Sequence, residues 1–243
     1  MRIPRIYHPQ SLQGQQSVTL TEHARIHVQQ ALRLAEQSSI ILFDGEGGEF
    51  QAVIRTIDKR AVIVDIGEYS AKEIESPLFL HLGQVISRGE KMDFTIQKAV
   101  ELGVNEITPL FSERCNVKLP HDRLQKKQQH WQSIIINACE QCGRNKIPVI
   151  NEPIDINNWL IQQRPGLKLI LHPSSNKSLL NKEPLQKNVT LLVGSEGGFA
   201  PDEINWAVEN HYQPLTLGPR VLRTETASLT AISVLQSLWG DFN

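Results

Sequence analysis

The last third of the chain contains two apolar, strand-like segments that each run into a polar loop. Residues 189–193 lead into the glycine-rich loop 194–199, and a later apolar segment leads into the loop 217–227. Glycine tolerates positive φ and lets a ligand approach bare backbone closely. Loops at the carboxyl ends of parallel strands commonly face a ligand. The two loops are therefore predicted to form one small-molecule site, although a glycine turn without a ligand is the alternative for the first loop alone.

Residues 76–243 are predicted to form one α/β domain, because strand-like and helical segments alternate along them. This alternation is typical of a parallel sheet with helices on both faces. The expected strands are 78–86, 107–111, 149–150, 167–171, 189–193 and 215–217, and the expected helices are 91–102, 121–142, 156–163, 201–210 and 226–239.

Residues 1–75 have a different pattern and are predicted to form a separate domain. Apolar segments at 39–43, 50–54 and 61–66 are joined by short polar turns. Such spacing indicates an antiparallel meander, which we expect to close into a small β-barrel. Thr19 and Glu22 have the spacing of a capping box, so a helix is expected to begin there.

Several common chemistries lack support in the residues. The glycine spacing at 194–198 matches neither the dinucleotide motif GxGxxG nor a phosphate-binding P-loop. Cys139 and Cys142 form a CxxC, but neither a second cysteine pair nor a histidine pair accompanies them, so a zinc site is not expected. Three cysteines and no apolar run long enough to span a bilayer favour a cytoplasmic protein without a metal or membrane partner.

Charge is distributed unevenly, although the formal net charge is only −1. Residues 114–146 contain seven Lys or Arg against two acidic residues. A basic patch of this kind can bind phosphates, but it can equally be a solvated helix face. The second loop contains Arg220 and, after two intervening residues, the consecutive residues Arg223, Thr224 and Glu225. These charges favour a functional site, and a structural ion-pair network is the alternative.

Taken together, the motifs resemble the bacterial small-subunit ribosomal RNA uridine N3-methyltransferases, the RsmE family of the SPOUT class. The segments that carry the resemblance are 2–7, 81–91, 98–104, 140–144, 194–199 and 217–227. One departure is Ser195, where many members of the family have proline.

The resemblance implies a fold and an activity. The fold is an N-terminal PUA-like β-barrel that binds RNA, followed by a SPOUT parallel sheet with a trefoil knot. The activity is methylation of N3 of one uridine in 16S rRNA (the family target is m3U1498 in the decoding region), with S-adenosyl-L-methionine as cofactor. The expected partners are small-subunit rRNA, within an assembled 30S particle, and a second copy of the chain. An apolar stripe on the helix 226–239 fits such a homodimer.

The resemblance also assigns roles to individual residues. Arg223 and Glu225 are the catalytic candidates: the arginine would stabilise an N3 anion and the glutamate would accept the N3 proton, and the sequence does not choose between them. The candidates for binding the cofactor are Leu171, His172, Gly194, Glu196, Gly197, Gly198, Leu217, Gly218, Leu222, Thr224, Thr226 and Ala227. The candidates for binding RNA are Arg2, Arg5, Arg88, Lys91, Arg114, Gln141 and Arg144.

Three alternatives stay open at this point. The chain could be a non-catalytic RNA-binding or assembly factor on the same scaffold. It could also be a SPOUT enzyme that acts on a different RNA nucleotide. His172 could be a structural histidine and not part of the site.

Overall fold

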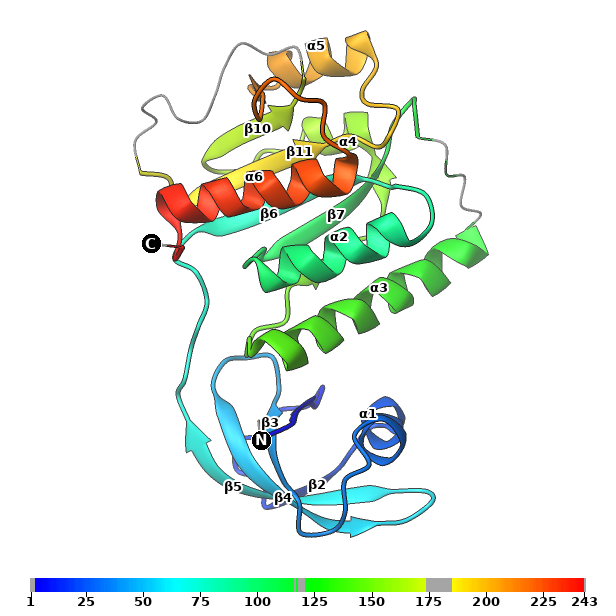
Figure 1. The fold of residues 1–243 in the computed structure, drawn as a ribbon, viewed down its shortest axis with the longest axis vertical. Helices are drawn as coiled ribbons and strands as arrows, with labels where there is room; N and C mark the ends of the chain where they lie inside the picture. Colours follow the sequence, from blue (N-terminus) through cyan, green and yellow to red (C-terminus); the bar gives the residue numbers. More distant parts are fainter. Residues whose placement is uncertain (1–2, 116, 118–120, 174–184, 243) are drawn as a thin grey trace. The chain divides into compact units, whose positions relative to one another are not determined.

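The structure is a computed structural model that describes residues 3–115, 117, 121–173 and 185–242. Its contacts divide the chain into two compact units (Figure 1). The first unit contains residues 1–75 together with 136–147, and the second contains residues 76–135 and 148–243. Within the described ranges, every helix is too short or too polar to cross a lipid bilayer.

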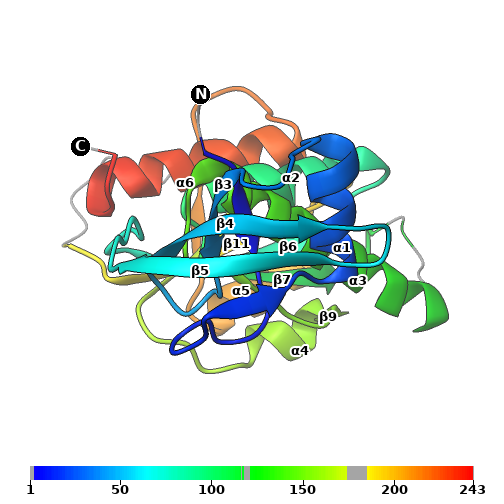
Figure 2. The same ribbon diagram turned by 90° about the horizontal axis from the view of Figure 1, so that it is seen from below.

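The first unit is built on a five-stranded sheet in the order β1-β3-β4-β5-β2. Its strands are β1 (Arg5–Tyr7), β2 (Ser17–Thr19), β3 (Ser39–Phe43), β4 (Glu49–Ile57) and β5 (Val62–Ser70). Along β4, the buried residues Phe50, Ala52 and Ile54 alternate with exposed neighbours, as expected for a strand with one face on the core. All neighbouring strands are antiparallel except β1 and β3 (Figure 2). The antiparallel meander predicted for 39–66 is therefore present.

A short helix precedes β3, but its start differs from the expectation. The helix α1 (Glu22–Ile26) continues as a π-helical turn, η1 (His27–Ala31). Its N-cap is Thr21, whose hydroxyl accepts a hydrogen bond from the Ala24 N–H at 3.3 Å. The predicted cap at Thr19 was wrong because that residue belongs to β2, where it pairs with Ile63 of β5.

The second unit is built on a parallel sheet in the order β12-β10-β11-β6-β7-β8, with β9 also pairing with β7. Every neighbouring pair of these strands is parallel. The strands are β6 (Phe79–Val85), β7 (Glu106–Phe111), β8 (Val149–Ile150), β9 (Ile154–Asp155), β10 (Leu167–Leu171), β11 (Asn188–Val193) and β12 (Gln213–Leu215). The order places β11 between β10 and β6, so segments distant in sequence meet at the centre of the sheet.

Helices cover both faces of this sheet. They are α2 (Glu90–Glu101), α3 (His121–Cys142), α4 (Ile156–Leu160), α5 (Pro201–Glu209) and α6 (Thr224–Trp239). Helices α2 and α6 lie on one face, and α4 and α5 lie on the other (Figures 1 and 2). The α4 face is packed around Trp159, and a Cβ at Gly83 would come within 2.4 Å of that ring. Gly83 therefore lets the indole lie directly on β6.

Two helix boundaries differ from the expectation by two residues or more. Helix α4 ends at Leu160, earlier than the predicted 163. Helix α6 begins at Thr224, so Thr224 and Glu225 belong to its first turn and not to the preceding loop. The carboxyl ends of β10, β11 and β12 meet at one edge of the sheet, where the His172 N–H donates to the Leu215 carbonyl at 2.8 Å. The loops that follow these strands are thereby gathered together.

Candidate functional site

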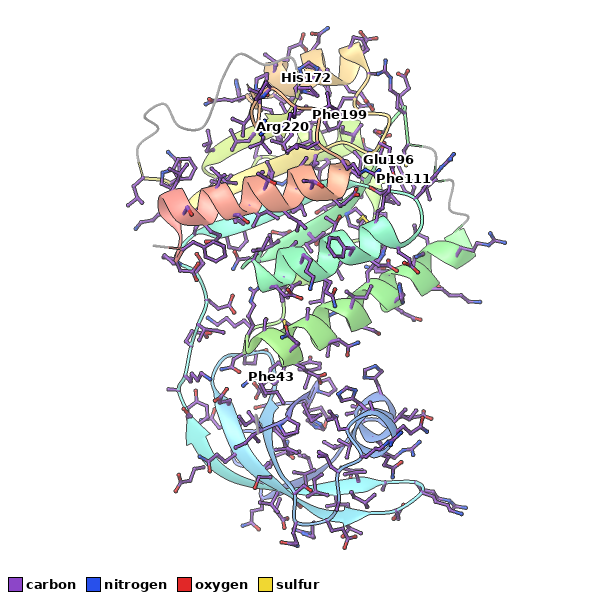
Figure 3. All side chains as sticks on the ribbon, viewed as in Figure 1. Phe43, Phe111, His172, Glu196, Phe199 and Arg220 are labelled. Carbon is purple, nitrogen blue, oxygen red and sulfur yellow. The ribbon has the colours of Figure 1, made fainter. Side chains whose placement is uncertain are left out.

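A cavity of about 590 Å³ lies at the carboxyl ends of β10 and β11. It gathers residues from the loops after both strands, from the start of α6 and from α2. The predicted site residues that line it are Lys91, Arg114, Leu171, His172, Gly194, Glu196, Gly198, Leu222, Arg223, Thr224 and Ala227. Figure 3 shows His172, Glu196 and Phe199 on the loops at this end of the second unit. The two loops singled out in the sequence therefore form one cavity.

The glycines of the first loop serve different purposes. Gly198 has φ of +66°, and a Cβ there would meet no atom within 4 Å, so its backbone faces open space in the cavity. Gly197 does not line the cavity, and a Cβ there would lie 2.9 Å from the Arg114 carbonyl oxygen. Gly197 is thus required for close packing. Gly198 leaves room that a bound molecule could use.

The two loops are joined directly by a buried hydrogen bond. The Thr224 hydroxyl donates to the Gly194 carbonyl at 2.6 Å. Thr224 is the first residue of α6, and Gly194 directly follows β11. The start of the helix is therefore held against the glycine loop.

An ion pair crosses the cavity lining between α2 and the glycine loop. Lys91 Nζ lies 2.8 Å from Glu196 Oε1. Burial would raise the pKa of Glu196, but the hydrogen bonds from Lys91 and from backbone N–H groups outweigh burial, and the pKa is lowered. Glu196 is thus ionised at neutral pH. Its pairing brings Lys91, predicted as an RNA contact, to the same site as the cofactor candidates.

The two catalytic candidates sit at the start of α6. Arg223 is the N-cap residue and an exposed part of the cavity lining, and it has no ion-pair partner among the described residues. Glu225 does not line the cavity, but its Oε2 atom is buried without a hydrogen-bond partner in the described part of the chain. One side chain therefore presents a positive charge to the cavity, and the other holds an acceptor atom that no described donor satisfies.

Other predicted residues lie outside the cavity lining. In the second unit these are Gly197, Leu217, Gly218, Glu225, Thr226 and Arg88. Gln141 is an exposed residue of the first unit. Arg2 lies outside the described residues.

Two arginines predicted to contact RNA are buried within the first unit. Arg5 pairs with Glu49 and hydrogen-bonds Asn145, and its guanidinium also lies 4.9 Å from the centre of the Phe43 ring. Arg144 forms a two-pronged pair with Glu75. These contacts give both side chains a structural role. Direct contact of either arginine with RNA stays a prediction. Burial does not favour it, because a buried guanidinium is not accessible to RNA.

The sequence analysis missed Gln84 and Ser228, which lie directly behind the cavity. Both are fully buried, and Gln84 hydrogen-bonds Thr224 and Ser228. A glutamine in an apolar strand has no spacing signature. Only the i, i+4 spacing of Thr224 and Ser228, which puts two hydroxyl groups on one face of a helix, could have drawn attention to this cluster.

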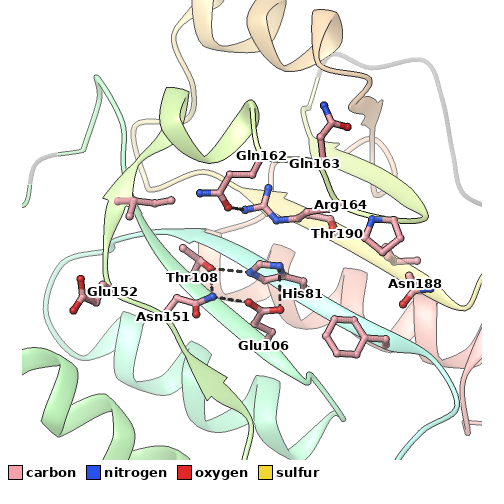
Figure 4. Close-up of a pocket in the computed structure, with 14 residues that line it drawn as sticks. His81, Glu106, Thr108, Asn151, Glu152, Gln162, Gln163, Arg164, Asn188 and Thr190 are labelled. Atoms are coloured by element: carbon pink, nitrogen blue, oxygen red, sulfur yellow. Dashed lines mark hydrogen bonds and ion pairs between the residues drawn. The ribbon is translucent and has the colours of Figure 1, made fainter.

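A second cavity, of about 440 Å³, lies at the opposite, amino-terminal ends of the strands. It contains a ring of polar side chains (Figure 4). Asn151 Nδ2 donates to Glu106 at 2.7 Å and to Thr108 at 2.8 Å, and His81 Nε2 lies 2.8 Å from the Thr108 hydroxyl. Burial and the charge of Arg164 lower the pKa of His81 to about 3, so the 3.5 Å contact between His81 Nδ1 and Glu106 joins a neutral ring to a carboxylate. These four side chains satisfy one another.

The CxxC lies at the end of α3 and has a structural environment. Cys139 is buried, and burial raises the pKa of its thiol to about 12. A thiol with such a pKa is a poor nucleophile and a poor metal ligand at neutral pH. In the described ranges, no group of three or more His, Cys, Asp or Glu side chains could hold a metal ion.

Family comparisons match both units. The family described as "RNA methyltransferase domain" matches residues 74–236, and the family described as "RNA methyltransferase PUA domain" matches residues 20–67. The chain is 42% identical to the ribosomal RNA small subunit methyltransferase E of Buchnera aphidicola subsp. Schizaphis graminum, over 100% of this chain and 99% of that protein. It is 26% identical to the protein of the same name in Bacillus subtilis, over 93% of this chain and 92% of that one.

Solved structures agree with the sequence comparisons. A Legionella pneumophila protein solved in complex with the cofactor SAM has a TM-score of 0.97 and 44% identity, with 100% of both chains covered. The ribosomal RNA small subunit methyltransferase E of Neisseria gonorrhoeae, solved bound to S-adenosyl methionine, has a TM-score of 0.93 and 39% identity, also with 100% of both chains covered. The expected fold class, a trefoil-knotted SPOUT sheet with a PUA-like β-barrel, is thereby confirmed. The chain has the fold of these proteins, a cavity formed by the two loops, and similarity over its full length. We conclude that the chain belongs to the ribosomal RNA small subunit methyltransferase E family.

Proposed function

We propose that this chain transfers a methyl group from S-adenosyl-L-methionine to N3 of a uridine in 16S rRNA. The observation that carries the proposal is the cavity at the carboxyl ends of β10 and β11, where glycine backbone meets Arg223, an arginine without an ion-pair partner among the described residues. Two relatives that match the chain over its full length are described as solved with this cofactor. We further propose that residues 1–75 bind RNA and that residues 76–243 hold the cofactor and the reacting uridine.

The residues of the cavity fit the proposed cofactor. A volume of about 590 Å³ is within the range of small-molecule sites. A Cβ at Gly198 would meet no described atom within 4 Å, so the backbone there has room for a ligand, and Leu171 and Leu222 supply apolar surface for an adenine ring. Glu196 is ionised and exposed in the cavity lining, so its carboxylate could accept hydrogen bonds from an amino or ribose hydroxyl group. Leu171, His172, Gly194, Gly198, Leu222, Thr224 and Ala227 would hold the cofactor together with Glu196.

The cofactor supplies an electrophilic methyl group on a sulfonium, and the chain must prepare the nucleophile. Uridine N3 carries a proton at neutral pH, and this proton must leave as the bond from N3 to carbon forms. Arg223 would stabilise the negative charge that develops on the uracil ring. Glu225 would accept the N3 proton, because it has a buried oxygen without a described hydrogen-bond partner.

The substrate particle and the assembly state belong to the same proposal. We propose that the substrate is rRNA within the 30S particle, at the family target m3U1498, that the protein acts in the cytoplasm, and that it is a homodimer. Of the stripe predicted on α6, Ala231 and Leu235 are buried within the second unit itself, whereas Leu238 is exposed. The exposed Phe242 lies just beyond the helix, so Leu238 and Phe242 leave an apolar end available to a second copy.

Two measurements test the proposal against its alternatives. Isothermal titration calorimetry of the full chain with S-adenosyl-L-methionine should give binding heat. No heat would favour a non-catalytic RNA-binding factor. Mass mapping of rRNA from a strain that lacks the gene should show the loss of one N3-methyluridine from 16S rRNA. Loss of a different modification would favour a SPOUT enzyme with another target.

A further inference from the structure

Gln84 lies near the carboxyl end of β6, immediately behind the cofactor cavity. Its side chain is completely buried and is absent from the cavity lining. In the sheet, Gln84 is the register partner of Val193, the residue directly before Gly194. Gly83, its neighbour in the strand, faces Trp159 on the α4 side. Because successive side chains alternate, Gln84 faces the opposite side, toward α6.

The hydrogen bonds around Gln84 form a directed chain. The Ser228 hydroxyl lies 2.6 Å from Gln84 Oε1, and Gln84 Nε2 donates to the Val85 carbonyl at 3.0 Å and to the Thr224 hydroxyl at 3.1 Å. Thr224 in turn donates to the Gly194 carbonyl at 2.6 Å. Carbonyl oxygens only accept, so the amide nitrogen must be on the side of Val85 and Thr224. The Ser228 hydroxyl also lies 2.9 Å from the Thr224 carbonyl, and Gln84 Nε2 lies 3.5 Å from the Gly194 carbonyl, so each donor of this network has at least one close acceptor.

This arrangement requires a side chain that donates and accepts at the same place. Thr224 and Ser228 are separated by one helical turn, so both hydroxyl groups point at the same spot on β6. A glutamine can accept from one hydroxyl and donate to the other. A leucine would leave both buried hydroxyl groups without this partner, and a glutamate would lose the two amide donors.

We infer that Gln84 is a positioning residue of the proposed cofactor site, acting through Thr224 and Gly194. It sets the distance between the start of α6 and the glycine loop, which are the two walls of the cavity. The inference rests on the proposed function, because it concerns the same site. It adds a residue that touches neither the cofactor nor the RNA and yet determines whether the cofactor cavity keeps its shape.

The same helix provides a matched control. Gln236 is also fully buried; its Nε2 donates to the Leu102 carbonyl at 2.9 Å and its Oε1 accepts from the Ser76 hydroxyl at 2.7 Å. It lies near the other end of α6, away from the cavity lining. Gln84→Leu and Gln236→Leu therefore each remove a buried side-chain amide. Only the amide of Gln84 is hydrogen-bonded to a residue that lines the cavity.

The test is calorimetry of the full chain with S-adenosyl-L-methionine, with Kd as the readout and thermal unfolding as the stability reference. Gln84→Leu should raise Kd about tenfold, which corresponds to about 1.4 kcal/mol, and should leave the KM for rRNA unchanged. Gln236→Leu should lower thermal stability similarly and keep Kd within about twofold of wild type. Equal Kd values for both variants, or an unchanged Kd for Gln84→Leu, would overturn the inference.

A milder pair covers the case in which Gln84→Leu does not fold. Ser228→Ala removes the hydroxyl that donates to Gln84, whereas Ser233→Ala removes a hydroxyl whose one hydrogen bond within the described ranges is to the Leu229 carbonyl of the same helix. Ser228→Ala should raise Kd about threefold, and Ser233→Ala should not change it. The same Kd for these two variants would contradict the inference. If the wild-type chain itself does not bind, the proposed function fails and the inference falls with it.

Discussion

The two ends of the parallel sheet carry cavities of similar size but opposite construction. At the amino-terminal end, His81, Glu106, Thr108 and Asn151 are joined in a ring by hydrogen bonds and by the 3.5 Å contact between His81 and Glu106 (Figure 4). At the carboxyl-terminal end, the walls are glycine backbone and loop residues, and Arg223 presents a charge that has no described ion-pair partner. The amino-terminal cavity has a histidine, a carboxylate and other polar side chains typical of active sites, but they bind one another. The carboxyl-terminal cavity has groups that are available to a ligand.

The two cavities differ in whether their polar side chains already have hydrogen-bond partners. In the amino-terminal cavity these side chains bind one another and stabilise the fold, whereas the carboxyl-terminal cavity has polar groups that could still bind a ligand. A buried polar group without a hydrogen bond is costly, so a satisfied ring stabilises the protein and is difficult to reorganise. The unsatisfied Oε2 of Glu225 near the start of α6 carries that cost in the described structure. Availability of hydrogen-bonding groups therefore indicates a functional cavity better than the number of polar residues does.

The largest expected effect comes from removing the charge at the carboxyl-terminal cavity. Arg223→Ala should reduce rRNA methylation by at least about 100-fold, because the developing charge on uracil loses its stabilising group. The unfolding temperature should not change, since the side chain is exposed. Arg220→Ala, an exposed arginine of the same loop outside the cavity lining, is the control. Methyl transfer to 30S particles measures both, and an active Arg223→Ala protein would remove Arg223 from the mechanism.

The second effect concerns the open space beside Gly198. Gly198→Ala adds a methyl group and places a residue with Cβ at φ of +66°, a strain of roughly 1–2 kcal/mol. The loop can relieve this strain by leaving its conformation, which should weaken S-adenosyl-L-methionine binding about tenfold. Gly14→Ala is the control, because Gly14 also has a positive φ and open space but belongs to the first unit. Equal Kd values by calorimetry would show that the cavity tolerates the methyl group.

A smaller effect compares two buried threonines at opposite ends of the sheet. Thr108→Val removes the hydroxyl between His81 and Asn151 and should cost about 1–2 kcal/mol of unfolding free energy without changing Kd for the cofactor. Thr224→Val removes the hydroxyl that bonds Gly194 and should change both quantities. Urea unfolding and calorimetry measure them. If Thr108→Val weakened cofactor binding instead, the amino-terminal cavity would have a functional role.

The last effect is a pH dependence of stability, which is absent at neutral pH and develops only as the solution is acidified. The pKa of His81 is about 3 in the folded protein and 6.5 in its ordinary state. As pH falls below 6.5, the unfolded chain takes up a proton that the folded chain does not. Folding stability is therefore lost as pH falls from 6.5 toward 3, by at most about 1.4 kcal/mol per pH unit.

The variant His81→Gln isolates this contribution. Its unfolding free energy should fall less steeply with decreasing pH than that of the wild-type protein, as measured by urea unfolding at a series of pH values. Other titrating groups contribute equally to both proteins and cancel in the difference. Identical slopes would mean that the buried ring titrates normally.

Local features of the fold could be predicted from the sequence. Helix α3 has the predicted bounds of 121 and 142. The strands β3, β4 and β5 lie where short polar turns separate apolar segments. The predicted helix cap was wrong because local spacing favours Thr19, which is followed three residues later by Glu22, whereas the structure uses Thr21. The pairing of Thr19 with a strand far along the chain decides between them.

The cavity was also partly predictable. Strand-to-loop junctions are local, and the rule that parallel strands present their carboxyl ends together brought the loops 194–199 and 217–227 to one place. Which residues of these loops face the cavity was not predictable. Gly197 packs on the Arg114 backbone, whereas Gly198, its neighbour, faces the open space.

By itself, the sequence predicted most of the helices and strands, the two loops that line one cavity, and the family, because each depends on short-range spacing or on several motifs in a fixed order. Only the tertiary structure decided which charges are free. Arg5 and Arg144 pair with Glu49 and Glu75, which lie 44 and 69 residues away along the chain. Gln84 meets Thr224 across 140 residues. Desolvation and hydrogen bonding act through distances in space, so no local pattern records which polar side chains are satisfied and which remain available.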